Sequence, residues 1–229
     1  TFGEHVSEQI HGSARWGELR RRYFDLIAEY RLAPDNIYRP TPPSLDDVLY
    51  WNERGLTAFN IMNVGNKPQY GQAEIDRILA TIELALEQYG SAGLADKAYV
   101  YGFDEIGPDA YAGLKQIFGA VGERFPQLKR LSAMQIAEPV FGYVDAWANT
   151  IETYDPELAR ERRAAGEEVW MYLSISGRAP YLNWFIEYPA IQARLVWWLA
   201  YLWDVDGFLY YFINHYDYRS GVLPRPIDV

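Results

Sequence analysis

Two adjacent carboxylates, Asp104 and Glu105, are the side chains of this chain best placed to do chemistry. They follow the apolar residues 99–103 directly, and a proline suited to the first turn of a helix comes only at Pro108. Mutual repulsion and aromatic surroundings raise the pKa of one member of such a pair, which leaves one acid and one anion. Cleavage of a glycosidic bond uses that combination. The alternative interpretation is an acidic cluster that caps the helix beginning at Pro108.

Aromatic side chains suggest what the carboxylates would act on. Aromatic residues make up 16% of the chain, with 8 Trp and 19 Tyr. Trp and Tyr can cover the C–H face of a sugar ring while keeping a polar tip available, so a ligand groove and a Trp-rich core are both open interpretations. The candidates for substrate binding stand near the expected ends of strands or in an aromatic loop, and they are Trp147, Tyr172, Asn183, Trp184, Tyr211 and Asn214. A loop that plugs the mouth of a barrel is the structural alternative for residues 178–189.

Other catalytic chemistries have weaker support in the sequence. The three histidines form no HExxH or His-x-His pair, cysteine is absent, and no serine lies in a G-x-S-x-G elbow. No phosphate-binding or dinucleotide-binding glycine motif follows an expected strand. We therefore expect neither a metal nor a cofactor. His5 and His11 could touch a substrate, although a surface loop is the alternative, and Asn60 and Asn63 are minor binding candidates.

Charge and hydropathy exclude two classes of partner. The formal net charge is −10 and no block of Lys and Arg appears, which argues against a nucleic acid. The most apolar segment, residues 190–203, is too short to span a bilayer and is apolar nearly all round, so we expect a buried helix. No signal peptide is visible, and the chain opens on Thr1, so we expect a piece of a longer polypeptide.

Short apolar segments alternate with longer helical ones along the whole chain. Helical spacing appears at residues 16–32, 44–54, 72–89, 108–125, 156–165 and 190–203, with Ser44 as a cap. Strands are expected at residues 37–38, 58–62, 98–101, 131–134, 144–147, 169–173 and 207–212, and residues 1–2 would be the end of an eighth. This alternation predicts an α/β fold, a (β/α)8 TIM-type barrel truncated at its first strand, as a single catalytic domain over residues 1–229.

Both carboxylates can serve one site only if the backbone leaves strand geometry. Successive residues of a strand face opposite ways, and barrel enzymes place their catalytic groups at the carboxyl ends of the strands. We expect Gly102 to permit the bend, because it carries no Cβ.

Four stretches of the chain resemble the catalytic barrel of glycoside hydrolase family 123, the β-N-acetylgalactosaminidases, and its uncharacterised relatives. They are residues 1–3, 101–105, 144–147 and 183–211. The last is the most specific, with Asn-Trp-Phe, an acid, Tyr-Pro, a helix and then a Gly-Phe-Leu-Tyr strand. The chain departs from the family pattern at Ile106, Leu182, Glu187 and Tyr211.

The resemblance implies a retaining enzyme that removes terminal β-linked N-acetylgalactosamine, or another N-acetylhexosamine, with help from the substrate's own acetamido group. Asp104 would orient and charge-stabilise that group, and Glu105 would be the general acid and base. The resemblance also implies a carbohydrate substrate, flanking β-rich domains and a secreted, periplasmic or cell-surface location. Two alternatives stay open: a glycosidase of the same superfamily acting on a non-acetylated sugar, and an inactive carbohydrate-binding barrel.

Overall fold

The computed structural model describes residues 2–211 and 213–214. These residues form two compact units, which are described separately. The first takes its described residues from Thr1–Asn36, Pro43–Phe59 and Phe212–Val229, and the second consists of Ile37–Pro42 and Asn60–Tyr211.

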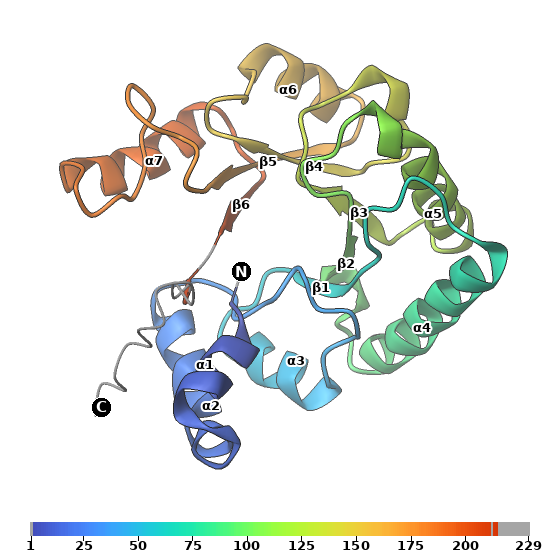
Figure 1. Ribbon diagram of the computed structural model, residues 1–229, viewed down its shortest axis with the longest axis horizontal. Coiled ribbons are helices and arrows are strands. Elements are labelled where there is room, and N and C mark those ends of the chain that lie inside the picture. The colour runs from blue at the N-terminus through green and yellow to red at the C-terminus, as the bar shows by residue number, and fades with distance from the viewer. Residues whose placement is uncertain (1, 212, 215–229) are drawn as a thin grey trace. The chain divides into compact units, whose positions relative to one another are not determined.

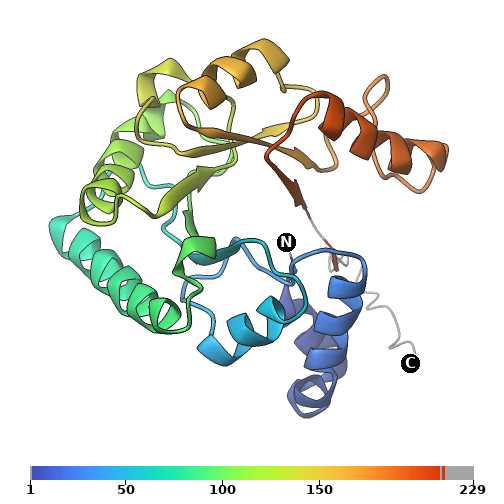
Figure 2. The same cartoon turned by 180° about the vertical axis from the view of Figure 1, so that it is seen from behind.

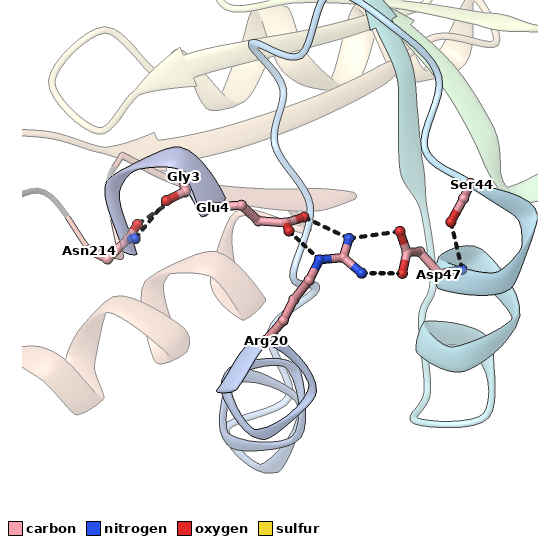
Figure 3. Close-up of polar contacts among 6 residues, drawn as sticks. All are labelled: Gly3, Glu4, Arg20, Ser44, Asp47 and Asn214. Carbon is pink, nitrogen blue, oxygen red and sulfur yellow. Dashed lines mark hydrogen bonds and ion pairs between the residues drawn. The ribbon is translucent and has the colours of Figure 1, made fainter. Parts of the chain in front are cut away.

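The first unit contains three helices, α1 (Glu4–His11), α2 (Ser13–Glu29) and α3 (Leu45–Asn52). One guanidinium joins them: Arg20 of α2 forms ion pairs with Glu4 of α1 at 2.5 Å and with Asp47 of α3 at 2.6 Å, as Figure 3 shows. Both pairs are two-pronged, which fixes orientation as well as distance. The cap expected at Ser44 is confirmed, because its hydroxyl accepts a hydrogen bond from the amide of Asp47.

Two expectations fall in the first unit and are wrong. His5 and His11 belong to helix α1 and not to a loop, and Nε2 of His11 lies 2.7 Å from the hydroxyl of Tyr23. The strand end expected at residues 1–2 is not formed by Phe2, whose amide makes a single bond to the carbonyl of Asp35; Thr1 lies outside the described residues.

The second unit is an α/β fold with one curled, half-barrel sheet. Its strands follow the chain order and are β1 (Phe59–Asn63), β2 (Ala98–Tyr101), β3 (Lys129–Ser132), β4 (Ala146–Thr150), β5 (Glu168–Leu173) and β6 (Gly207–Tyr210). All neighbouring pairs from β2 to β6 are parallel. Four helices connect strands and lie outside the curve of the sheet in Figures 1 and 2, namely α4 (Gln72–Ser91), α5 (Tyr111–Arg124), α6 (Pro156–Ala164) and α7 (Ile191–Leu202).

The expected α/β class is confirmed, and six of the seven expected strands lie in this sheet, with some bounds shifted. The strand predicted at residues 37–38 is wrong, because Ile37 and Tyr38 form a turn. The segment is short and runs into Pro40, which has no amide hydrogen to donate to a ladder. Arg39 nevertheless accepts a hydrogen bond from the amide of Asn63, so the turn lies against the end of β1.

Burial of the helix predicted at residues 190–203 is also wrong. In α7 only Val196 is buried, while Trp198 is 70% and Tyr201 is 87% exposed. A helix that covers a sheet turns one face to it, so apolar residues all round cannot all be buried by that single contact. Within the described part of the chain, no helix is both long and apolar enough to cross a membrane.

Gly102 is required for close approach and not for a bend. A Cβ at this position would lie 2.6 Å from Cγ2 of Val64 and 2.9 Å from the carbonyl oxygen of Gly65, so β2 can approach the chain after β1 only without a side chain here. The residues in left-handed conformation come next: Phe103 has φ 58° and Glu105 has φ 51°.

Replacing Gly102 by Ala should therefore destabilise the fold by about 1–3 kcal/mol, the usual cost of overpacking. Urea unfolding measures this. The control is Gly90→Ala in the last turn of α4, where an added Cβ meets nothing within 4 Å and the change should be neutral or stabilise by up to about 1 kcal/mol. An unchanged unfolding midpoint for Gly102→Ala would contradict the close approach.

Candidate active site

The acidic pair lies in a tight turn that hydrogen bonds hold from both sides. The amide of Phe103 donates to the carbonyl of Gly65 after β1 at 3.0 Å, and the amide of Glu105 donates to the carbonyl of Ala133 after β3 at 2.7 Å. The hydroxyl of Ser132 donates to the carbonyl of Phe103 at 2.6 Å. A left-handed residue other than glycine costs about 1–2 kcal/mol, so these bonds maintain a backbone that the chain would not adopt alone.

The turn gives the two carboxylates different partners. The hydroxyl of Tyr38 donates to Oδ2 of Asp104 at 2.6 Å, and the hydroxyl of Tyr172, on β5, donates to Oε1 of Glu105 at 2.6 Å. Asp104 is half-buried whereas Glu105 is exposed. Each carboxylate thus accepts a hydrogen bond from a different tyrosine, although the two residues are consecutive.

The capping interpretation of the pair does not fit this geometry. The 3-10 helix η2 (Pro108–Ala110) has Gly107 at its N-cap, and no side chain caps it. Helix α5 likewise begins without a side-chain cap. The two carboxylates are therefore free of a helix-capping role.

Burial raises the pKa of Asp104 and of both tyrosines. Loss of water raises the pKa of Asp104 above its ordinary value; the hydroxyl of Tyr38 lowers it, the neighbouring Glu105 raises it further, and the hydroxyl of Tyr101 lowers it. Burial also raises the pKa of Tyr38 and of Tyr172, and their hydrogen bonds to the carboxylates act in the same direction. Both phenols therefore stay protonated near neutral pH and remain hydrogen-bond donors.

Two cavities adjoin at the acidic pair. The smaller has a volume of about 270 Å³ and is lined by Tyr38, Asn63, Asn66, Phe103, Asp104 and Glu105. The larger, about 530 Å³, has Glu105, Tyr111, Gln135, Thr150, Glu152 and Tyr172 in its wall. Among the described residues, Glu105 alone lines both. The walls draw on the carboxyl ends of β1 to β5, the edge at which parallel α/β enzymes place their sites.

One candidate binding residue bonds to the acidic pair, and a second packs against the tyrosine that bonds to Asp104. Tyr172 bonds directly to Glu105, and the ring of Tyr211 packs edge-on against the ring of Tyr38 with 6.1 Å between centroids. Asn63, a minor candidate, lines the smaller cavity.

Trp147 is not brought to the pair. Its side chain is fully buried, and its indole N–H donates to Oε2 of Glu167 at 2.5 Å, just before β5 begins. Strand β4 begins two residues later than expected and ends at Thr150, so Trp147 is its second residue and not its last. Side chains alternate along a strand, and it is Ala148 and Thr150 that line the larger cavity.

Asn183 and Trp184 lie in the loop before α7 and line neither cavity. The amide of Asn183 donates to the carbonyls of Ser174 and Gly177, both at 2.9 Å, which ties the loop to the end of β5. Trp184 packs against the apolar cluster around Val196. Asn214 belongs to the first unit, where it is buried and bonds both backbone groups of Gly3 (Figure 3).

Tyr38 and Glu152 are among the site residues that the sequence pattern did not indicate. Tyr38 lies 66 residues before Asp104, and no local pattern links them. Glu152 lies just beyond the end of β4, after Ile151, and a correct end for that strand would have pointed to it. Within residues 2–211 and 213–214, no group of three His, Asp or Glu side chains is placed to hold a metal ion.

Comparison with known proteins identifies the family of the chain. No curated protein matches the chain. A family 123 glycoside hydrolase from Clostridium perfringens, whose structural analysis concerns glycolipid glycan hydrolysis, resembles it with a TM-score of 0.64 at 11% identity. The match covers 91% of this chain and 48% of that one, so the chain spans about half the length of its structural relative.

A second structure, a putative glycerophosphoryl diester phosphodiesterase from Silicibacter pomeroyi, matches with a TM-score of 0.41 at 15% identity, over 67% of this chain and 46% of that one. Residues 47–221, well over half of the sequence, match the model of the glycoside hydrolase 123 catalytic domain. This chain therefore belongs to the family of glycoside hydrolase 123 catalytic domains.

Proposed function

We propose that the protein carrying this chain is a retaining glycoside hydrolase that removes a terminal β-linked N-acetylhexosamine, with N-acetylgalactosamine favoured. The observation that carries the proposal is the split environment of Asp104 and Glu105. The two residues are consecutive, yet each has its own tyrosine, and only Glu105 borders both cavities. Family membership supports the reaction class.

The proposed mechanism needs no nucleophile from the protein. The oxygen of the substrate's 2-acetamido group attacks the anomeric carbon while the bond to the leaving oxygen breaks. Glu105 gives its proton to that oxygen, and Asp104 orients the acetamido group and balances the positive charge that grows on its nitrogen. Glu105 then takes a proton from the water that opens the oxazolinium ring, so configuration is retained. The carboxylate spacing of ordinary retaining enzymes does not apply.

The tyrosines fit this division of labour. Asp104 has to be an anion, and the hydrogen bond from Tyr38 offsets part of the penalty that burial imposes on its ionised form. Tyr172 holds Oε1 of Glu105, which leaves Oε2 for proton transfer. We further propose that the curled sheet is part of a (β/α)8 barrel, which is supported by its strand order and by its likeness to the family 123 structure.

Substitution of the two acids tests the proposal. Glu105→Gln should lose activity on the order of a hundredfold on substrates with poor leaving groups, and much less on a nitrophenyl glycoside, whose leaving group departs without a proton. Asp104→Asn should lose a hundredfold or more on both, because formation of the intermediate is itself impaired. Steady-state kinetics with N-acetylgalactosaminides of both kinds measure this.

Asp109→Asn is the matched control, since Asp109 is exposed on η2 and lines neither cavity, and it should behave as wild type. Equal losses of Glu105→Gln on both substrates would remove its assignment as the acid. Full activity of Asp104→Asn would contradict catalysis assisted by the acetamido group and would favour a substrate with a non-acetylated sugar. Binding of the sugar without turnover by wild type would indicate an inactive carbohydrate-binding barrel.

The raised pKa of Asp104 also predicts a pH effect. Activity that needs ionised Asp104 falls as the pH drops through its pKa, and Tyr38→Phe removes the hydrogen bond that lowers this pKa. The acidic limb of the kcat/KM profile should therefore move to higher pH in Tyr38→Phe, with the largest loss at acidic pH. Tyr143→Phe, which lines neither cavity, should keep the wild-type profile. An acidic limb that stays in place or moves to lower pH would contradict the role of Tyr38.

A further inference from the structure

Glu152 is a third carboxylate at the site, and the proposed mechanism does not use it. It stands in the turn after β4 and lines the larger cavity together with Glu105. Its Oε2 is buried, and no described residue donates a hydrogen bond to it. A buried carboxylate oxygen without a donor is costly, and such groups in native proteins usually await a ligand, an ion or water.

The neighbouring loop leaves space for this carboxylate. A Cβ at Gly177 would lie 3.2 Å from Oε2 of Glu152 and 2.9 Å from Cγ2 of Ile151. The side-chain amide of Asn183 donates to the carbonyl of Gly177 and so fixes the loop at that distance. Asn183 thus contributes to the site by positioning the loop around Glu152.

The rest of the larger cavity has the mixed character that suits a sugar. Thr150 and Thr153 contribute hydroxyls 2.9 Å apart, and Gln135 and Ser176 add further polar groups. The apolar part of the wall comes from Ile106, Pro108, Met134, Ile136, Ala137 and Ala148. Hydroxyls of a ring could bond to the polar side while its C–H faces contact the apolar side.

The geometry of the acidic pair decides which part of a substrate each cavity takes. Asp104 lines only the smaller cavity, so a terminal sugar whose acetamido group meets Asp104 lies there. Glu105 lines both cavities, and as the acid it has to reach the oxygen between that sugar and the leaving group. The leaving group then extends into the larger cavity, toward Glu152.

We infer that the larger cavity is a subsite for a leaving sugar, and that Glu152 recognises it by accepting hydrogen bonds from its hydroxyl groups. This rests on the proposed hydrolysis at Glu105 and names the substrate class: glycans whose second residue is a neutral sugar with free hydroxyls. Because Glu152 presents a carboxylate to this cavity, a negatively charged second residue would be disfavoured by repulsion.

The test compares two substrates with the same terminal β-N-acetylgalactosamine: a disaccharide whose leaving group is a neutral hexose, and the nitrophenyl glycoside. The ratio of kcat/KM for the disaccharide to kcat/KM for the nitrophenyl glycoside should fall about tenfold or more in Glu152→Gln. The reason is that the disaccharide loses a hydrogen bond to a charged acceptor, whereas the nitrophenyl group makes no such bond. Glu152→Leu, which removes both acceptor oxygens, should lower the ratio further. The exposed Glu138, which lines neither cavity, gives the control Glu138→Gln, and its ratio should stay that of wild type.

The thermal unfolding temperature of each Glu152 variant is measured alongside its kinetics. Because Oε2 of Glu152 has no partner in the free protein, both Glu152 variants should be at least as stable as wild type, so a lower ratio would not reflect unfolding. Equal effects of Glu152→Gln on the two substrates, or no effect on either, would overturn the subsite. Failure of the wild-type protein to hydrolyse the nitrophenyl glycoside would instead overturn the proposed function.

Discussion

The turn at Phe103–Glu105 is the constraint on which the site depends. Two left-handed residues surround Asp104, and hydrogen bonds from the ends of both neighbouring strands hold them. Such a backbone costs free energy that only packing and hydrogen bonds on both sides can offset. The close approach of β2 to the chain after β1, which needs Gly102, brings one of these acceptors within reach. In return, two consecutive carboxylates project into different surroundings, which an ordinary strand would achieve only by placing them on opposite faces of the sheet.

Those surroundings differ in burial and in hydrogen-bond partner. Asp104 is half-buried, which raises its pKa, and the hydroxyl of Tyr38 offsets part of that rise. Glu105 is exposed at the junction of the two cavities. The tyrosines come from distant parts of the second unit's sequence, one before β1 and one on β5. Partners from distant parts of the sequence thus give two carboxyl groups of the same kind different environments. The third carboxylate, Glu152, adds an acceptor on the side that Asp104 does not reach.

Local sequence patterns predicted the features of the fold that depend on residues close together in the chain. Strand β2 and the acids behind it could be located because an apolar run ends directly in two carboxylates. The same reasoning failed at Trp147, because an error of two residues in the start of β4 moves the predicted end of the strand, and the side-chain alternation then decides which face a residue takes. Tyr38 could not be found, since its contact with Asp104 spans 66 residues and the turn carrying it has no strand pattern. Trp184 is a residue type suited to stacking on a sugar ring, yet it packs against the apolar cluster beneath α7.

In the proposed mechanism, Asp104 meets the acetamido group of a terminal sugar in the smaller cavity while Glu105 meets the bond to be broken. A crystal structure of the protein with the thiazoline analogue of N-acetylgalactosamine tests it most directly, since that compound mimics the intermediate. We predict that the sugar ring occupies the cavity lined by Tyr38 and Asn63, with the thiazoline nitrogen about 2.7–2.9 Å from the carboxylate of Asp104 and the anomeric carbon beside Glu105. A ring bound in the larger cavity, or a thiazoline nitrogen turned away from Asp104, would contradict the account.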